Sequence, residues 1–470
     1  MKNFILKYFS DIRFWIVFFF LIRLYGITDP PLEIGHNWRQ VTGIMVSKNF
    51  LEVDNNILYP RVDETGEKSG IIGMEMPIMN YMIYMISYVF GFNDWYGRLL
   101  NLIVSSIGTF YFFRLVKVFS SPQIAFNATI TLLVSIWFAY SRKTMPDTFS
   151  MAIVITSFYY GLRFFQTNSK IDFCIYGLLL LVGTLSKIPS AFLLCNLAFP
   201  LLTKGIRTTK LFLVLAVTAV VLSITCAWYF YWNPHLSETY GNWYNSGKGI
   251  TEGVTQVASN LGGAMEKFYF SGLESYVCFA VFIFGIVALI RERKKIALTM
   301  LGINFLFFIG FIFKSGDTFC THSYYIIPFV PVMAVVAGYA LDKIARINKK
   351  YQVTLLLIIS LEALANQNND FRLKEDQLYK MQLESFANSI SYKNELIAIN
   401  GGENPQLIYF AHRNGWSVEN EKLCDEKFLD EIKSKGCKAV IIDKHKFPGF
   451  MEKAPFEKIL ETDDFVAYRL

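Results

Sequence analysis

Apolar runs long enough to cross a lipid bilayer recur along the chain and limit what it can fold into. They include residues 14–24, 211–232, 277–290, 300–313 and 324–341, which approach or reach the roughly 20 residues that span about 30 Å of hydrocarbon as a helix. Hydrophobic residues make up 53% of the 470 residues and charged residues only 18%, below the roughly one quarter usual for soluble domains. The predicted fold class is therefore a polytopic α-helical membrane protein.

Basic clusters between the runs predict the orientation of the chain. Loops rich in Lys and Arg face the cytoplasm by the positive-inside rule, so an even number of spans must separate any two of these clusters. The four clusters are Lys2, Lys7 and Arg13; Lys204, Arg207 and Lys210; Arg291, Arg293, Lys294 and Lys295; and Lys343, Arg346, Lys349 and Lys350.

Two segments decide the number of spans. Residues 172–203 carry Lys187 and Pro189 at their middle and would make a single helix of about 48 Å, so they are predicted to form two short spans. Residues 76–91 number only 16 and hold four methionines, so they are predicted to lie as an interfacial helix. The result is about 11 spans with the N-terminus inside and the C-terminal region outside. In the alternative, 76–91 crosses and 172–203 is one span.

Five polar segments then share the outer face. They are the loop 28–77, the turns 141–148 and 186–190, the loop 233–270 and the turn 314–323. After the last span the composition becomes that of a soluble domain, with strands expected near 396–400 and 439–443 and helices near 406–412 and 425–435. The predicted domains are a transmembrane domain, 1–365, and a soluble α/β domain on the outer face, 366–470.

The net charge of +7 is explained by the basic clusters, so no nucleic-acid partner is expected. The seven cysteines form no C-x-x-C or Cys/His metal spacing, and no metal site is assigned. Cys424 and Cys437 are either a disulfide, if they face an oxidising compartment, or two free thiols. No cofactor is expected, and a divalent metal is left open as an alternative.

The loop 28–77 contains the residue types needed to bind a phosphate and to move a proton. Arg39 and Arg61 are suited to a phosphate because a guanidinium donates paired, charge-assisted hydrogen bonds. His36 and Glu75 are candidates to accept a proton from an attacking hydroxyl. The alternative is a solvated loop pinned at the membrane surface by Trp38.

A second set of charges stands at the ends of spans, where ionisable groups are costly unless they are paired or hydrated. Arg142, Lys143 and Asp147 share one short turn, and Lys187 occupies another. The functional interpretation is contact with a lipid phosphate, with Asp147 as a base at the mouth of a cavity. The alternative is interfacial snorkelling of the cations, with Asp147 as a helix cap.

Residues His322, Tyr324 and Tyr325 open a later span. They are candidates for contact with a substrate on the outer face. The alternative is structural, because tyrosines are common anchors at membrane interfaces.

The order of these pieces resembles the GT-C superfamily of membrane glycosyltransferases, particularly the bacterial relatives of protein O-mannosyltransferases and of the lipid A aminoarabinose transferase. The similarity covers about residues 10–345. The motifs that carry it are Glu75-Met76-Pro77, Gly97-Arg98-Leu99, Pro146-Asp147, Ser186-Lys187-Ile188-Pro189 and His322-Ser323-Tyr324-Tyr325.

The resemblance implies an inverting glycosyltransferase that moves a hexose or pentose from a polyprenyl-phosphate donor to an acceptor glycan, lipid or protein on the outer face of the bacterial cytoplasmic membrane. Membrane lipids are the other implied partners. A carboxylate of the first loop usually serves as base, but residues 36–40 occupy the region of the family's Asp-Glu pair. The base therefore stays open between Asp147, Glu75 and His36. The alternatives in function are a flippase of lipid-linked glycans and a glycan polymerase or ligase.

Overall fold

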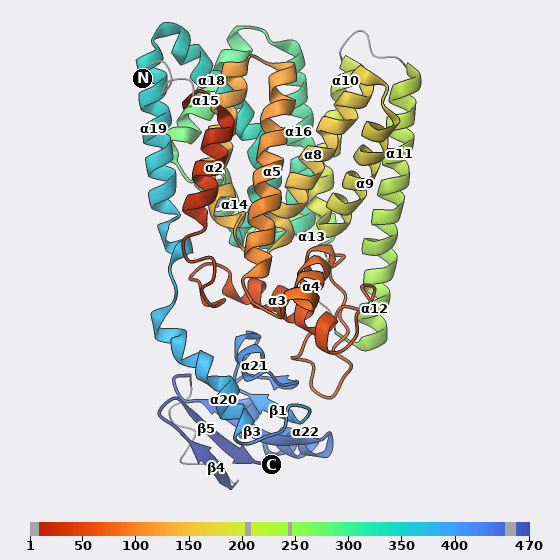
Figure 1. Cartoon of the computed structure of the whole chain (residues 1–470), viewed down its shortest axis with the longest axis vertical. Helices are drawn as coiled ribbons and strands as arrows, with labels where there is room; N and C mark the ends of the chain where they lie inside the picture. Colours follow the sequence, from red (N-terminus) through yellow and green to blue (C-terminus); the bar gives the residue numbers. More distant parts are fainter. Residues whose placement is uncertain (1–8, 203–207, 243–246, 447–456) are drawn as a thin grey trace. The chain divides into compact units, whose positions relative to one another are not determined.

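The computed structural model describes residues 9–202, 208–242, 247–446 and 457–470. The chain divides into two compact units, which we call the helical unit and the mixed unit (Figure 1). The helical unit comprises Met1–Ile27, Gly97–Phe230 and Ser246–Phe371. The mixed unit comprises Thr28–Tyr96, Tyr231–Asn245 and Arg372–Leu470.

The helical unit consists of helices joined by short turns. Its helices are α2 Ile12–Arg23, α5 Tyr96–Phe119, α6 Pro122–Val134, α7 Trp137–Tyr140, α8 Pro146–Thr167, α9 Lys170–Ser186, η1 Ile188–Ala198, α10 Phe199–Leu202, α11 Thr208–Ala227, η2 Trp228–Trp232, α13 Ile250–Ser259, α14 Leu261–Glu266, η3 Lys267–Ser271, α15 Tyr276–Arg291, α16 Lys295–Ser315, α17 Asp317–Thr321, η4 Ser323–Phe329, α18 Val330–Ile347, α19 Lys349–Asn366 and η5 Asn368–Phe371.

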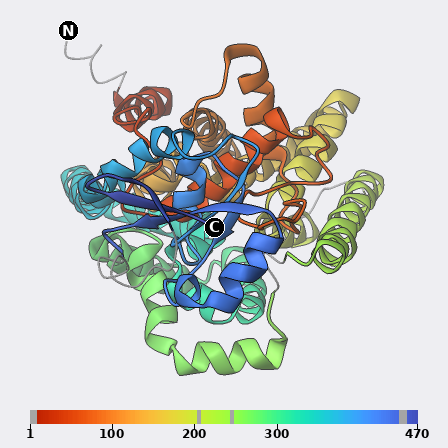
Figure 2. The ribbon, with the colours of Figure 1, turned by 90° about the horizontal axis from the view of Figure 1, so that it is seen from below.

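Among the described residues, four helical segments are long and apolar enough to cross a membrane: Tyr96–Phe119, Thr209–Tyr240, Lys295–Ser315 and Ser323–Ile347. A fifth is present if Leu261–Ser271 and Tyr276–Arg291, which meet at 91°, form one broken span. In Figure 2 the light-green chain around residues 250–270 is seen from its side, whereas several neighbouring helices are seen end-on. The molecule is thus rich in membrane-type helices, and the count of about 11 spans stays a prediction.

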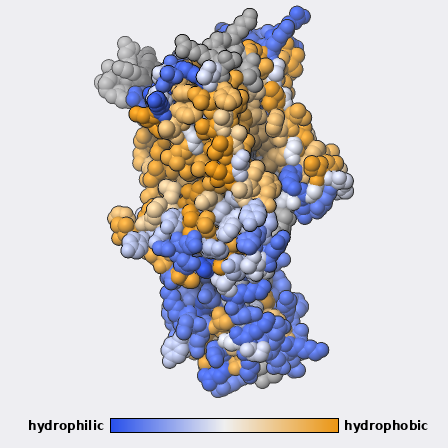
Figure 3. Space-filling model, turned by 90° about the vertical axis from the view of Figure 1, so that its right-hand side faces the viewer, coloured by the Kyte–Doolittle hydropathy of each residue, from blue (hydrophilic) through white to orange (hydrophobic). Residues whose placement is uncertain are grey.

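The surface of the helical unit is apolar where these helices face outward. Figure 3 shows apolar side chains covering the face that lies at the right of Figure 1, where α11 is found. The exposed large side chains of α11 are Phe212, Leu213, Leu215, Val220 and Ile224. Such a continuous apolar surface is suited to lipid rather than to water.

The chain breaks at Lys187, in the region that the sequence predicts to form two segments. Helix α9 ends at Ser186, Lys187 has an extended backbone, and the 3-10 helix η1 follows with Pro189 near its start. Helix α4, Ile78–Phe90, has only 13 residues. It lies where the sequence predicts a short interfacial helix.

The mixed unit is built around a five-stranded sheet with the order β2-β1-β3-β5-β4. Strands β1, β2 and β3 are parallel, whereas β5 pairs antiparallel with β3 and β4. The elements of this unit are α3 Asn37–Glu52, α4, α12 Asn233–Tyr240, η6 Glu375–Gln382, α20 Leu383–Asn388, β1 Leu396–Ile399, α21 Gln406–Ala411, β2 Gly415–Ser417, η7 Lys422–Cys424, α22 Glu426–Ser434, β3 Cys437–Asp443, β4 Lys458–Glu461 and β5 Phe465–Arg469.

The two faces of the sheet are covered by different helices. Alternate residues of a strand point to opposite faces, so Ile397 packs with α21 in one core cluster and Ala398 with α22 in another. The first cluster also contains Ile44 of α3. The polar loop of residues 28–77 therefore shares a core with the C-terminal sheet.

Backbone hydrogen bonds join the loop to strand β2. The amide of Gly66 donates to the carbonyl of Gly415 over 2.7 Å, and the amide of Gly415 donates to the carbonyl of Asp63 over 3.0 Å. The cysteines of this unit do not pair, since Cys424 and Cys437 are both free.

Close packing of α6 on α18 depends on Gly338. A Cβ atom at this position would lie 2.6 Å from the backbone nitrogen of Ala128. We expect Gly338→Ala to destabilise the protein by about 1–3 kcal/mol through overpacking. Gly302→Ala on α16 is the matched control, because nothing lies within 4 Å of its added Cβ. Thermal unfolding in detergent checks this, and equal stability of the two variants would contradict it.

Candidate functional site

Helices α8 and α9 form an antiparallel hairpin that brings Asp147 and Lys187 together. Helix α8 begins with Pro146, whose fixed φ suits the first turn, and ends at Asn168, which has a left-handed backbone. Asp147 is therefore at the start of α8, and Lys187 follows the end of α9. Their Oδ1 and Nζ atoms are 3.8 Å apart, with side chains 9% and 12% exposed. At the other end of the hairpin Arg163 pairs with Asp172 over 3.3 Å.

Asp147 is not a helix cap in this structure. The N-cap of α8 is Met145, with no side-chain capping bond. The carboxylate lies instead in a buried environment beside a cation, which is the arrangement expected of a functional carboxylate at the end of a span.

Arg142 and Lys143 are buried rather than snorkelled to an interface. Both are almost fully enclosed, and Lys143 Nζ is 2.7 Å from Asp370 Oδ1. The Arg142 guanidinium lies 4.4 Å from the ring centroid of Phe371, a cation–π distance. The chain from α19 through η5 thus closes on the turn between α7 and α8.

Asn101 of α5 holds this turn in shape. Its Nδ2 is within 2.8–3.1 Å of the carbonyl oxygens of Tyr140, Lys143 and Met145, and its Oδ1 accepts from Thr148 Oγ1 over 3.1 Å. One amide therefore satisfies several backbone groups that helix ends leave without intrahelical partners.

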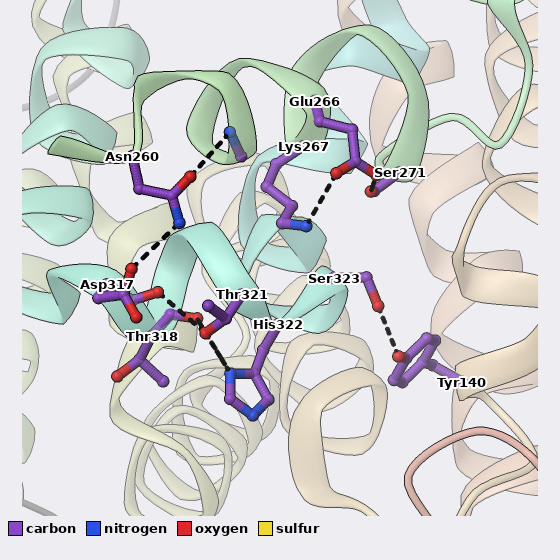
Figure 4. Close-up of polar contacts among 11 residues, drawn as sticks. Tyr140, Asn260, Glu266, Lys267, Ser271, Asp317, Thr318, Thr321, His322 and Ser323 are labelled. Atoms are coloured by element: carbon purple, nitrogen blue, oxygen red, sulfur yellow. Dashed lines mark hydrogen bonds and ion pairs between the residues drawn. The ribbon is translucent and has the colours of Figure 1, made fainter. Parts of the chain in front are cut away.

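The segment around His322 is distant in sequence from the α8–α9 hairpin but lies in the same helical unit (Figure 4). Lys187 Nζ lies 6.0 Å from the ring centroid of Tyr324, and Ser323 Oγ is 2.7 Å from Tyr140 Oη. His322 Nδ1 is 3.0 Å from Thr321 Oγ1. Burial lowers the pKa of His322 below its ordinary value, so this imidazole is neutral at neutral pH.

Further polar contacts connect the segments that flank His322. Asn260 Nδ2 donates to Asp317 Oδ1 over 3.1 Å, and Lys267 Nζ is 3.6 Å from Glu266 Oε2 (Figure 4). Tyr325 stacks on Phe311 with ring centroids 5.9 Å apart. The ring of Tyr325 thus packs against Phe311, and the ring of Tyr324 faces the Lys187 ammonium.

In the mixed unit, Arg39 forms an ion pair with Glu75. Gln40 Nε2 donates to Glu33 Oε2 over 2.8 Å, and His36 is the N-cap of α3 with a φ of 55°. Arg61 Nη1 is 2.7 Å from Asp54 Oδ2, a carboxylate near the surface. Arg39 and Glu75 thus contact each other within the mixed unit, whereas Arg61 has a partner near the surface.

The predicted site residues fall into two groups, each within one unit. The helical unit holds Arg142, Lys143, Asp147, Lys187, His322, Tyr324 and Tyr325. The mixed unit holds His36, Arg39, Arg61 and Glu75. Within the described ranges no cluster of three or more His, Cys, Asp or Glu side chains is arranged to hold a metal ion.

Two sets of residues were not singled out from the sequence. Asn101 gives no local signal, because its partners lie about 40 residues away. Asp63 and Glu64 do give a local signal, because they form an adjacent Asp-Glu pair in the first loop. This pair follows residues 36–40 in the sequence. Burial raises the pKa of Asp63 to about 6 and that of Glu64 to about 7. Asn49 Nδ2 donates to Asp63 Oδ1 over 2.6 Å, which ties Asp63 to α3.

We expect Asp63→Asn to flatten the pH dependence of stability between about pH 4 and pH 6. The unfolded carboxyl titrates near 3.8 and the folded one near 6. The native state holds more protons between these values, so its stability falls as pH rises, by at most roughly 3 kcal/mol. Melting temperatures measured against pH check this. Asp54→Asn should keep the wild-type slope, because the Arg61 bond lowers the pKa of Asp54, and an unchanged slope in Asp63→Asn would contradict the assignment.

Part of the chain matches the model of a known protein family. Residues 75–231 match the model of the dolichyl-phosphate-mannose-protein mannosyltransferase family. Comparison with curated proteins gives no match.

Solved structures match nearly the whole chain. ArnT from Cupriavidus metallidurans matches in its apo state with a TM-score of 0.61 and 12% identity, over 97% of both chains. The same protein bound to undecaprenyl phosphate matches with a TM-score of 0.60 and 11% identity, over 97% of this chain and 98% of that one. The apo oligosaccharyltransferase of Archaeoglobus fulgidus matches with a TM-score of 0.57 and 11% identity, over 92% and 70% of the two chains. The chain thus has the fold of ArnT and of the archaeal oligosaccharyltransferase, and its residues 75–231 match the dolichyl-phosphate-mannose-protein mannosyltransferase family.

Proposed function

We propose that this protein is an integral-membrane glycosyltransferase that moves a sugar from a polyprenyl-phosphate donor to an acceptor glycan, lipid or protein on the outer face of the cytoplasmic membrane. The observation that carries the proposal is the concentration of cations inside the helical unit. Arg142 and Lys143 are almost fully buried, and Lys187 faces Asp147. Buried cations at the ends of apolar helices are expensive and fit an anionic ligand.

The lipid partners of structural relatives support a phosphate as that ligand. ArnT was solved with undecaprenyl phosphate. AglB from Archaeoglobus fulgidus was solved with dolichol-phosphate and an inhibitory peptide, at a TM-score of 0.54 and 13% identity over 92% of this chain and 70% of that one. We assign the donor phosphate to Arg142, Lys143 and Lys187 of the helical unit, and Arg39 and Arg61 of the first loop stay candidates for phosphate contacts from the sequence. His322, Tyr324 and Tyr325 are assigned to further contacts with the donor.

The proposed step is an inverting displacement at the anomeric carbon. The acceptor oxygen forms a bond to this carbon while the bond from the carbon to the phosphate oxygen breaks, and its electron pair leaves with the polyprenyl phosphate. The acceptor proton passes to a carboxylate, Asp147 or Glu75, with His36 as the third candidate. Cations beside the phosphate stabilise the transition state more than the ground state, because negative charge develops on the leaving group.

The Asp147 carboxylate is the stronger of the two acidic candidates. Its Oδ1 lies 3.8 Å from Lys187 Nζ, which places it beside a cation that we assign to the departing phosphate. Glu75 is already hydrogen-bonded to Arg39, which suits a carboxylate that orients a phosphate-binding arginine.

We expect Asp147→Asn to lower the rate of polyprenyl phosphate release about 10²–10⁴-fold, the usual worth of a general base. Glu75→Gln should lower it less, through a misplaced Arg39. The assay follows release of undecaprenyl phosphate from a panel of undecaprenyl-phosphate hexoses and pentoses, with purified protein and added acceptor.

The matched control is Asp172→Asn, which removes the ion pair at the opposite end of the α8–α9 hairpin and should keep wild-type activity. Full activity in both Asp147→Asn and Glu75→Gln would refute the base assignment. If the wild-type protein neither binds nor consumes any donor of the panel, the proposed function is refuted and transport of lipid-linked glycans is favoured.

The proposed topology has 11 spans, with the N-terminus in the cytoplasm and residues 366–470 outside. The positive-inside rule supports it, and so do the short α4 and the break at Lys187. Cys424 is a free, exposed thiol that reports the side directly. We expect a membrane-impermeant maleimide to label it in sealed right-side-out vesicles, with Cys424→Ser as the control that loses the label. Labelling that needs prior opening of the vesicles would contradict this orientation.

A further inference from the structure

A deep apolar hollow opens in the helical unit beside the turn between α15 and α16. Its volume of about 1010 Å³ is at the upper end of the roughly 300–1,000 Å³ that ligand pockets occupy. Helices α5, α8, α16 and α18 contribute most of its walls. Typical lining side chains are Phe112, Ile155, Phe158, Leu193, Leu301 and Val335.

The polar groups inside the hollow satisfy one another. Asn304 Nδ2 donates to Asn196 Oδ1 over 3.0 Å, and Asn196 Nδ2 donates to Asn304 Oδ1 over 3.1 Å. The hydroxyl of Tyr176 is 2.6 Å from Thr218 Oγ1. Because these groups are already paired, the hollow offers a hydrocarbon chain an apolar surface without the cost of unsatisfied amides.

Three consecutive cations stand at one end of the hollow. Arg293, Lys294 and Lys295 all line it, and the turn that carries them has a defined backbone. The amide of Lys294 donates to the carbonyl of Leu289 over 3.0 Å, and the amide of Arg293 donates to that of Ile290 over 3.0 Å. This is the Schellman pattern of a helix end, with Arg293 at a φ of 54°. The cations are therefore presented by a fixed turn.

The carboxylate of Glu292, which belongs to the same turn, contacts residues of α18. Glu292 pairs with Lys343 and accepts a hydrogen bond from Tyr339 Oη over 2.6 Å, and it is 3.9 Å from Lys294 Nζ. Among the described residues that line the hollow, none is acidic. The mouth therefore carries a net positive charge beside an apolar interior.

This mouth and the proposed catalytic residues lie at opposite ends of α16. The mouth is at its first residue, Lys295, whereas Lys187 faces Tyr324, which follows the end of the helix at Ser315. A 21-residue helix is about 30 Å long, the thickness of the hydrocarbon core. A donor whose phosphate is near Lys187 therefore cannot place that phosphate near Lys295.

We propose that the hollow is a binding site for an anionic two-chain phospholipid, separate from the donor site. Its phosphate binds Arg293, Lys294 and Lys295, and its acyl chains fill the apolar interior between α5, α8, α16 and α18. Basic pockets between membrane helices are known to favour anionic head groups. The volume and the paired amides explain why acyl chains, rather than a polar solute, occupy the space.

The charge requirement is tested with two matched double variants. Lys294→Gln with Lys295→Gln removes two cations at the mouth, and Lys349→Gln with Lys350→Gln removes two exposed cations of a neighbouring basic cluster that do not line the hollow. Native mass spectrometry after exchange from phosphatidylglycerol or phosphatidylcholine vesicles measures the bound lipid. We expect phosphatidylglycerol to bind the wild type preferentially, and the mouth variant to bind it roughly 25-fold more weakly, a factor of about five for each cation. The control variant should bind it like the wild type.

The location of the acyl chains is tested with Val335→Trp, which fills the hollow, and Leu306→Trp, an exposed position on α16 outside it. The first variant should lose the retained phosphatidylglycerol and the second should keep it. Equal loss in both charge variants, retention in Val335→Trp, or loss in Leu306→Trp would each overturn the proposal. So would a tightly retained polyprenyl phosphate, displaced by Val335→Trp, in place of the two-chain lipid. Thermal unfolding of each variant in the same detergent verifies that it is folded before the lipid is measured.

Discussion

The requirement to stabilise buried cations shapes the turns of the helical unit. An ion taken from water into a protein interior loses several kcal/mol of solvation, which only good partners recover. Lys143 meets Asp370, Lys187 meets Asp147, and Arg142 lies over the ring of Phe371. These contacts join segments that are distant in sequence, so they determine the register of the α8–α9 hairpin and the path of the chain after α19.

The same requirement connects structure to the proposed chemistry. Buried cations are unfavourable for an apolar bundle alone, but they provide the environment in which a departing lipid phosphate is stabilised. Structural relatives with only 11–12% identity retain the fold over 97% of this chain. A pattern of apolar helices can thus be maintained by many different apolar sequences.

The sequence was informative wherever its signals were local. Apolar length predicts the membrane-type helices, and Pro189 and Lys187 predict the break after α9. The short apolar runs at 396–400 and 439–443 predict two strands of the C-terminal sheet. The Asp63-Glu64 dipeptide is an equally local signal, but the burial that raises the pKa of both carboxyls comes from the tertiary fold.

The remaining features depend on contacts across long separations. Nothing near Asn101 in the sequence indicates that it clamps the turn that carries Lys143, and nothing near Asp370 indicates an ion pair with that lysine. The core shared by the first loop and the C-terminal sheet is likewise invisible to composition, since either part alone has the pattern of an independent polar segment. Such pairings follow from the tertiary fold and not from any periodicity of the chain.

Equilibrium binding of undecaprenyl phosphate measures whether the cations of the helical unit bind a lipid phosphate. Purified wild-type protein should bind undecaprenyl phosphate more tightly than the neutral alcohol undecaprenol. Lys187→Gln should lose about 10- to 100-fold in affinity for the phosphate, the worth of one charged hydrogen bond, with no change for undecaprenol. Equal affinities of the wild type and Lys187→Gln for undecaprenyl phosphate would contradict the account.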